Sequence, residues 1–369
     1  MRGNRSLMRG SKKIFAGELR ALVREIFSTA GMTAEDSFVL ADSLVEADRC
    51  GVSTHGTARV APYLQQLISG QVNNRPQETI LADRASALLI DADRAFGAPV
   101  GIRVLKRAME KAKITGVCLA GVKNVAHFGA AGYYTRYAAE RGFLAFAMSS
   151  TSPSVVPFGG MTPRIGNSPM SFATPGEQHP ELVLDMAQSM TSRGRIKLAM
   201  ETGQTIPESW AIDKEGNPTT DPKEALSGAV LPSGGHKGSA MSLMVEMLAS
   251  GLTGAHLSQE IHHAGFTSRR QEGPAGAEID VTVGNSYIVI DSSVFGEEQE
   301  VRKRSTRIAE YVRASKPVPG VASVLAPGDV ELAKRRETDA HGITLSAHVF
   351  ETLHDIAAER NVPMPAFAG

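Results

Sequence analysis

From Ala85 onward the chain alternates short apolar runs with longer amphipathic stretches, and this alternation limits the possible folds more than any other feature of the sequence. Runs of this length and composition are typical of buried strands. Amphipathic stretches at 97–113 and 131–141 separate some of them and predict helices. The apolar runs are Ala87–Ile90, Gly116–Ala120, Phe143–Ala147, Met170–Ala173 and Leu182–Leu184. We therefore predict an α/β protein built on a sheet of buried strands.

Helical periodicity flanks this central part on both sides. Residues 16–30 and 34–49 repeat apolar residues at helical spacing, with Thr33 as a predicted N-cap of the second helix. The apolar face of that helix consists of Phe38, Leu40, Ala41, Leu44, Val45 and Ala47. From about residue 300 the texture is again charged and helical, and Thr344–Arg360 is predicted as the last helix. The N- and C-terminal segments are thus expected to form a helical lobe beside the sheet domain.

Length and these changes of texture divide the chain of 369 residues, since a single core rarely exceeds about 250–300 residues. Residues 1–13 carry five basic side chains and no acidic one, and no apolar signal core follows, so we expect a disordered basic extension. We assign 14–80 to an N-terminal helical lobe, 81–300 to the central sheet domain and 301–369 to a C-terminal helical segment that packs back on the N-terminal lobe.

Charge and cysteine content exclude several classes of protein. The 39 basic and 39 acidic residues balance, which argues against binding to nucleic acid or to an anionic membrane. No apolar run reaches the roughly 18 residues of a membrane span. The two cysteines, Cys50 and Cys118, form no Cys-x-x-Cys pair, are expected to be buried apolar residues, and suit a reducing compartment, which predicts a cytoplasmic protein.

Two histidine motifs stand out as candidate catalytic sites. Gly51–Arg59 and Asn124–Tyr134 each place one histidine, His55 or His127, among small residues that leave room for a ligand. Arg59 follows His55 by four residues, about one helical turn, and is suited to bind a carboxylate. Each motif also fits an ordinary Gly-rich turn. Together they favour an enzyme that acts on a 2-oxo or 2-hydroxy acid.

A third glycine-rich run, Gly234–Gly238, precedes an apolar helix predicted from Ala240 to Leu252. Free backbone N–H groups, the helix dipole and Lys237 would converge there on a bound anion, although a turn before a core helix explains the run equally well. No Gly-x-Gly-x-x-Gly follows a strand, so a dinucleotide would have to bind differently from a Rossmann domain. The methionines of this helix, Met241, Met244 and Met247, are predicted to pack in the core.

Metal chemistry has no signature in the sequence. There is no His-Glu-x-x-His motif, and the adjacent pair His262 and His263 would point in different directions on a regular element. We predict that no metal is needed.

The motifs occur in the order found in one family, and over residues 14 to 350 the chain resembles the malate/L-lactate dehydrogenase family, type 2. Its superfamily includes ureidoglycolate and sulfolactate dehydrogenases and reductases of cyclic imino acids such as piperideine-2-carboxylate. The residues that carry the resemblance are Ser53–Gly56, Arg59, Tyr63, Gly70, His127–Gly129, Asn167–Pro169, Leu184–Ala187, Asp221–Pro222 and Gly234–Gly238.

The resemblance implies a fold, a cofactor and site residues. The expected fold is a non-Rossmann sheet domain, residues 81–300, that binds NAD or NADP. The acid/base group is His127 or His55, and we favour His127 because it would lie closer to the nicotinamide. Arg59 would anchor the substrate carboxylate, and the hydroxyls of Thr54 and Tyr63 would orient the substrate. The cofactor contacts implied are His127, Phe128, Gly129, Ser150, Asp185, Met186, Ala187, His236, Lys237 and Arg313.

The resemblance also implies a homodimer in which the N-terminal lobe of one subunit helps to close the active site of the other. For the substrate, the segment around Arg195 matters, because the imino-acid reductases are described with an aspartate there and the hydroxyacid dehydrogenases commonly with a lysine. Arg195 keeps the positive charge. We therefore expect a 2-hydroxyacid dehydrogenase of malate, lactate or sulfolactate type. An NADPH-dependent reductase of cyclic imino acids and a catalytically silent binding protein are the alternatives.

Overall fold

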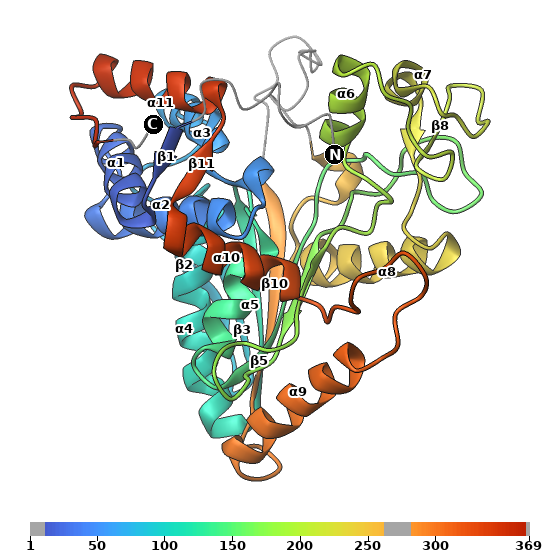
Figure 1. Ribbon diagram of the computed structural model, residues 1–369. Helices are drawn as coiled ribbons and strands as arrows, with labels where there is room; N and C mark the ends of the chain where they lie inside the picture. The colour runs from blue at the N-terminus through green and yellow to red at the C-terminus, as the bar shows by residue number, and fades with distance from the viewer. Residues whose placement is uncertain (1–11, 262–281, 367–369) are drawn as a thin grey trace.

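The computed structural model describes residues 12–261 and 282–366, and a mixed seven-stranded sheet forms its centre (Figure 1). The strand order is β2-β3-β4-β10-β5-β6-β7, and each neighbouring pair is antiparallel except β3 with β4. The strands are β2 (Thr79–Asp83), β3 (Ala87–Asp91), β4 (Val117–Val125), β5 (Phe143–Ser149), β6 (Met170–Ala173), β7 (Val183–Met186) and β10 (Val283–Asp291). The predicted α/β class is confirmed.

The five strands predicted from the apolar runs correspond to β3 to β7, with β4 continuing to Val125 and β7 to Met186. The central strand β10 was not predicted. It pairs with β4 on one side and with β5 on the other, and so completes the centre of the sheet. It begins 110 positions after the last residue of β6. Its run Tyr287-Ile288-Val289-Ile290 is the signal that identifies it, because β-branched and aromatic residues favour buried strands.

Helices cover both faces of the sheet (Figure 1). Helices α4 (Gly97–Thr115) and α5 (Ala131–Ala139) pack on one face, where Ala145 and Ala147 of β5 join their apolar cluster. Helix α8 (His236–Glu246) and the π-helical turn Met247–Gly251 pack on the other, against Met148. Successive residues of β5 therefore point alternately to the two helix layers, as the pleat of a strand requires.

The two ends of the described chain meet in a helical region at one end of the sheet (Figure 1). Strands β1 (Lys12–Ile14) and β11 (Ile343–Leu345) pair antiparallel, α1 contacts α11, and α2 contacts α10. A common apolar cluster joins residues such as Leu19, Leu44 and Leu353. The helices are α1 (Ala16–Thr29), α2 (Ala34–Arg49), α3 (Val60–Ile68), α10 (Asp329–His341) and α11 (Ala347–Glu359).

The remaining elements follow β7 or β10 along the chain. A small apolar cluster around Ile196 and Ala225 joins α6 and α7 with the short strand pair β8–β9. Helix α9 follows β10 and leads into the segment before α10. These elements are α6 (Arg193–Glu201), β8 (Ala211–Ile212), α7 (Pro222–Ser227), β9 (Ala229–Val230), the 3-10 turn η4 (Ser258–Glu260) and α9 (Glu298–Arg313).

Several local predictions are confirmed and others need correction. The Thr33 hydroxyl accepts a hydrogen bond from the backbone N–H of Asp36, as an N-cap should. Lys12 and Lys13 belong to β1, whereas residues 1–11 of the predicted extension lie outside the described residues, as do His262 and His263. The last helix begins at Ala347, not at Thr344, because Ile343–Leu345 pair with β1 and Ser346 caps the helix.

One residue of a predicted apolar face is exposed, and the prediction that the α8 methionines pack in the core was wrong. Phe38 is 46% exposed although the rest of its predicted face is buried. Met241, Met244 and Met247 are 37, 44 and 59% exposed, because α8 turns its small residues toward the sheet instead. The helix also begins at His236, earlier than Ala240, and changes to a π-helical turn after Glu246.

No helix in the described ranges is both long and apolar enough to span a bilayer. Within the same ranges, no three His, Cys, Asp or Glu side chains come close enough together to hold a metal ion. Both cysteines are buried, as predicted, and free; Cys118 lies in the apolar core, whereas Cys50 contacts the polar side chains of Glu46 and Arg136.

Candidate active site

The first histidine lies in the connection between α2 and α3. Two consecutive 3-10 turns, η1 (Ser53–His55) and η2 (Thr57–Arg59), are separated by Gly56, and α3 follows directly. The Arg59 Nε donates a hydrogen bond to the backbone carbonyl of Thr54 at 2.6 Å, so the arginine folds back over the turn. His55 and Arg59 thus do not lie on one continuous helical turn, because Gly56 between them is extended.

The second histidine lies between β4 and α5. The backbone carbonyl of His127 accepts a hydrogen bond from the N–H of Gly97, which fixes the connection against the start of α4. A side chain on Gly97 would collide with this connection, since a Cβ there would lie 2.7 Å from the His127 carbonyl oxygen. Gly129 has φ +82° and open space where a Cβ would be, so the backbone beside His127 is accessible to a ligand.

The fold brings the two histidines together from positions 72 residues apart. Their rings are stacked, with centroids 5.7 Å apart and planes at 19°. The buried Tyr63 hydroxyl is hydrogen-bonded with Nδ1 of His127, and the Tyr63 ring packs against Phe96. His55 in turn has its Nδ1 3.1 Å from the Thr54 hydroxyl. The predicted substrate residues therefore form one cluster around the two imidazole rings.

Arg59 is a charged member of this cluster, whereas His55 and Tyr63 are neutral near pH 7. Burial, and secondarily the positive charge of Arg59, lower the pKa of His55 from 6.5 to about 4, so His55 is neutral near pH 7. Burial also lowers the pKa of Arg59, although it stays charged, and raises the pKa of Tyr63 far above its usual range. The cluster thus presents one fixed positive charge beside neutral hydrogen-bonding groups. This arrangement suits an anionic substrate that carries a second polar group.

Asp185 lies at the end of β7 and closes one side of the α5 N-terminus. Its Oδ2 accepts a hydrogen bond from the backbone N–H of Gly132 at 2.8 Å. Desolvation by the surrounding protein raises the pKa of its carboxyl. Met186 and Ala187 follow it at the strand end.

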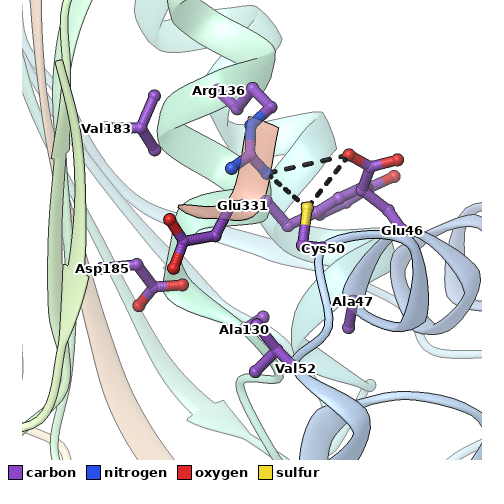
Figure 2. Close-up of a pocket in the computed structure, with 10 residues that line it drawn as sticks. Glu46, Ala47, Cys50, Val52, Ala130, Arg136, Val183, Asp185 and Glu331 are labelled. Carbon is purple, nitrogen blue, oxygen red and sulfur yellow. Dashed lines mark hydrogen bonds and ion pairs between the residues drawn. The ribbon is translucent and has the colours of Figure 1, made fainter. Parts of the chain in front are cut away.

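Figure 2 shows Asp185 on one wall of a recess that also contains Cys50, Glu46, Arg136 and Glu331. Burial raises the pKa of the Cys50 thiol to about 11, so it is not a reactive thiolate. Arg136 donates to the Cys50 sulfur at 3.4 Å and lies 3.7 Å from the Glu46 carboxylate. Arg136, Glu46 and Cys50 are therefore linked to one another in this recess next to the strand end, and apolar residues such as Val52 and Val183 line the rest of it.

The glycine-rich run before α8 is open. Gly234 and Gly235 have φ of +63° and +64°, and a Cβ on Gly234 would meet no atom within 4 Å. His236 and Lys237 are exposed in the first turn of the helix, where His236 packs edge-on against Phe158. Unlike Gly234, Gly238 has no room, since a Cβ there would lie 1.9 Å from the Ser233 carbonyl oxygen. An exposed cation at an open helix N-terminus is a suitable anion site.

Besides Asp185, two residues of the implied cofactor set have other partners in the structure, and the Phe128 ring is 4% exposed and packs in the apolar core. Ser150 is fully buried, and its hydroxyl receives a hydrogen bond from the N–H of Gly284 at 2.9 Å, so its side chain supports the β5–β10 pair. Arg313 is ion-paired with Asp329 at 2.6 Å and with Glu181 at 2.8 Å, and the Asp329 hydrogen bonds are the main cause of its raised pKa. Arg313 thus belongs to a separate cluster that fixes the end of α9.

Sequence reasoning missed Asp48, a buried carboxylate at the end of α2. It accepts hydrogen bonds from the backbone N–H of Thr57 at 2.8 Å and from the Thr57 hydroxyl at 2.6 Å. Burial raises the pKa of this carboxyl to about 6. An acid three residues before Gly51-Val52-Ser53-Thr54-His55 was the available signal, but helical periodicity alone does not distinguish it from a surface acid.

Comparisons with known proteins agree on a single family. The family model of malate/L-lactate dehydrogenases matches residues 14–354. An L-sulfolactate dehydrogenase of Methanothermobacter thermautotrophicus is 35% identical over 92% of this chain and 95% of its own length. A Delta(1)-pyrroline-2-carboxylate/Delta(1)-piperideine-2-carboxylate reductase of Pseudomonas putida is 32% identical over 92% and 95%.

Solved structures give the same result. The sulfolactate dehydrogenase from Methanocaldococcus jannaschii superposes with a TM-score of 0.87 at 30% identity, and the match covers 96% of this chain and 98% of that one. The likeness therefore extends over both the sheet and the helical end of the molecule.

Proposed function

Because the chain belongs to the malate/L-lactate dehydrogenase family and is therefore an oxidoreductase, we propose that it transfers hydride between a nicotinamide and a small 2-hydroxy or 2-oxo acid of malate, lactate or sulfolactate type. The observation that carries this proposal is the cluster of His55, His127, Tyr63 and Arg59. It combines a fixed cation, which binds a carboxylate, with the imidazole ring of His127, which exchanges a proton with the oxygen on carbon 2 of the substrate.

Arg59 binds the substrate carboxylate. Its Nε is engaged with the Thr54 carbonyl, which holds the guanidinium in a defined orientation. A guanidinium presents its donors in a planar fork that matches a carboxylate. The Thr54 hydroxyl is exposed beside His55 and orients the substrate.

His127 handles the proton. It donates a proton to the oxygen on carbon 2 as a 2-oxo acid is reduced, and it accepts the proton in the reverse reaction. The hydrogen bond between Tyr63 and Nδ1 fixes the orientation of the ring. His55 is the weaker candidate, since a pKa of about 4 leaves it without a proton to give near pH 7.

The cofactor is NAD or NADP, and the residues present fit it. Gly129 and Gly234 leave open space where a Cβ would be, and Lys237 and His236 stand exposed at the α8 N-terminus, where a phosphate would be bound. Asp185, Met186, Ala187 and the backbone of Phe128, whose ring is buried in the apolar core, complete the contacts, while Ser150 and Arg313 act indirectly through Gly284, Glu181 and Asp329. When bound, the nicotinamide supplies or accepts the hydride. The sequence contains no Gly-x-Gly-x-x-Gly motif, so this site binds the dinucleotide without one.

The protein acts as a homodimer in the cytoplasm. Exposed apolar side chains gather on α8, on the turn that follows it and on α9, and a second copy would remove them from water. They are Met241, Leu243, Met244, Met247, Leu252, Ile308, Tyr311 and Val312. Two buried free cysteines suit a reducing compartment.

Reduction of a cyclic imino acid is the second candidate function. The Pseudomonas putida relative carries that name and is nearly as similar as the dehydrogenases. Against it, Arg195 at the start of α6 keeps a positive charge where such reductases are described with an aspartate.

The test measures oxidation of NADH and of NADPH by absorbance with oxaloacetate, pyruvate, sulfopyruvate and freshly made piperideine-2-carboxylate. We expect turnover of at least one 2-oxo acid. Turnover of the imine alone would replace the dehydrogenase by the reductase. A lack of turnover with every substrate, together with an unchanged melting temperature in the presence of either coenzyme, would contradict both and favour the silent binding protein.

A further inference from the structure

Asp48 is a buried carboxylate that the proposed reaction does not consume or contact. It belongs to the last turn of α2, and it is 9% exposed. Its Oδ2 accepts both the N–H and the hydroxyl of Thr57, which is itself 2% exposed. Its Oδ1 lies against Gly56, since a Cβ on that glycine would be 1.9 Å away. The carboxylate therefore contacts two of the three residues that lie between His55 and Arg59, namely Gly56 and Thr57.

We infer that Asp48 is a positioning residue, which fixes the 3-10 turns at Gly56 and Thr57 so that His55 and Arg59 keep the geometry needed for an acid substrate. This inference rests on the proposed function for the identity of the substrate. The attachment of the turn to α2 is independent of it.

The position of the contact separates this role from ordinary helix stabilisation. Asp36, at the other end of α2, is also buried, but it pairs with Arg103 of α4 and so links two helices. Asp48 instead bonds to the turn that carries the substrate residues, across nine residues of sequence. Burial of an ionised carboxylate is costly unless its oxygens are hydrogen-bonded, and the raised pKa of Asp48, about 6, reflects that cost. Its two bonds to Thr57 offset that cost only in part.

The first experiment compares steady-state kinetics of Asp48→Asn, Thr57→Val and Thr57→Ser with those of Asp36→Asn, the matched control on the same helix. We expect Asp48→Asn to lower kcat/KM for the acid substrate by about 10-fold or more, with KM for the coenzyme changed by less than about 2-fold. Thr57→Ser, which retains the hydroxyl, should remain close to the wild type, and Thr57→Val should lie between. Asp36→Asn should lower the melting temperature without this selective loss.

The second experiment needs no activity. Hydrogen–deuterium exchange of peptides covering 53–59 should become faster in Asp48→Asn and in Thr57→Val, and should stay unchanged in Asp36→Asn. If the wild type reduces none of the tested acids, the proposed function fails, and this measurement still decides whether Asp48 holds the turn. Unchanged exchange in both variants would overturn the attachment. Equal losses for substrate and coenzyme, or a loss no larger than that of Asp36→Asn, would overturn the positioning role. Thr57→Val serves where Asp48→Asn does not fold.

Discussion

His55 and His127 look alike in the sequence, since each lies among small residues, and only their surroundings in the fold distinguish them. His127 is hydrogen-bonded with the buried Tyr63 hydroxyl. His55 is half-buried beside Arg59, which disfavours a second positive charge. The same side chain therefore has two different environments, and the proposed function assigns proton transfer to His127 and the lining of the substrate position to the neutral ring of His55.

This difference predicts unequal effects of substitution. His127→Ala should lower kcat by about 10²-fold with coenzyme affinity largely kept, the usual scale for a lost general acid. His55→Ala should affect mainly KM for the acid, as should Arg59→Ala. Steady-state kinetics with coenzyme binding measured by fluorescence titration check this. A larger loss of kcat in His55→Ala than in His127→Ala would reverse the assignment.

The titration of His55 is a separate prediction. Its folded pKa of about 4 lies below its ordinary value of 6.5, so the unfolded chain binds a proton first as the pH falls. The neutral ring thus contributes stability that is fully present above pH 6.5 and is lost as the pH falls toward 4. Imidazole NMR shifts of the protein without ligands should show His55 unprotonated at pH 5.5, with His55→Gln identifying its signal. A midpoint near 6.5 would contradict the burial argument.

At the scale of elements, the start of α8 combines an open turn with a close contact. Gly234 and Gly235 adopt positive φ, which favours glycine, whereas Gly238 is required because the Ser233 carbonyl occupies the space of a Cβ. The exposed first turn with Lys237 is thus held in place by a packed residue directly behind it.

Gly238→Ala should therefore destabilise the protein by about 2 kcal/mol or more and weaken coenzyme binding, because the turn must shift to admit the methyl group. Gly17→Ala is the control: this glycine is in α1 and a Cβ there meets nothing within 4 Å, so the substitution should be neutral or slightly stabilising. Urea unfolding followed by circular dichroism measures both. Equal stability of the two variants would show that the α8 turn yields at little cost.

At the scale of the whole molecule, the exposed methionines of α8 form an apolar surface that nothing in the described part of a single chain covers. The helix uses Gly238, Ser239 and Ser242 toward the sheet, which allows close approach, and leaves Met241 and Met244 outward. Flexible apolar side chains that remain exposed on one helix face are typical of protein interfaces.

Met244→Glu should therefore shift the protein from dimer to monomer by placing a charge in the contact, and its activity should fall at low protein concentration. Ile114→Glu, at an 86% exposed position in the last turn of α4, should leave the assembly unchanged. Light scattering coupled to size exclusion measures the mass of each. A monomeric wild type, or a dimer unaffected by Met244→Glu, would contradict the assignment of this face.

The sequence by itself determined the α/β class, five strands of the sheet, the first two helices and the motifs of the site, because each depends on local periodicity or on the chemistry of a short segment. Only the tertiary structure decided the rest. The run Tyr287–Ile290 favours a strand, but its place between β4 and β5 depends on pairing with strands far away along the chain, which leaves no local pattern. Which face of α8 is buried depends on what the sheet presents to it. The roles proposed for Asp48, His55 and His127 depend on burial and on partners brought together across the fold, and these set charge and orientation beyond what the residue type alone specifies.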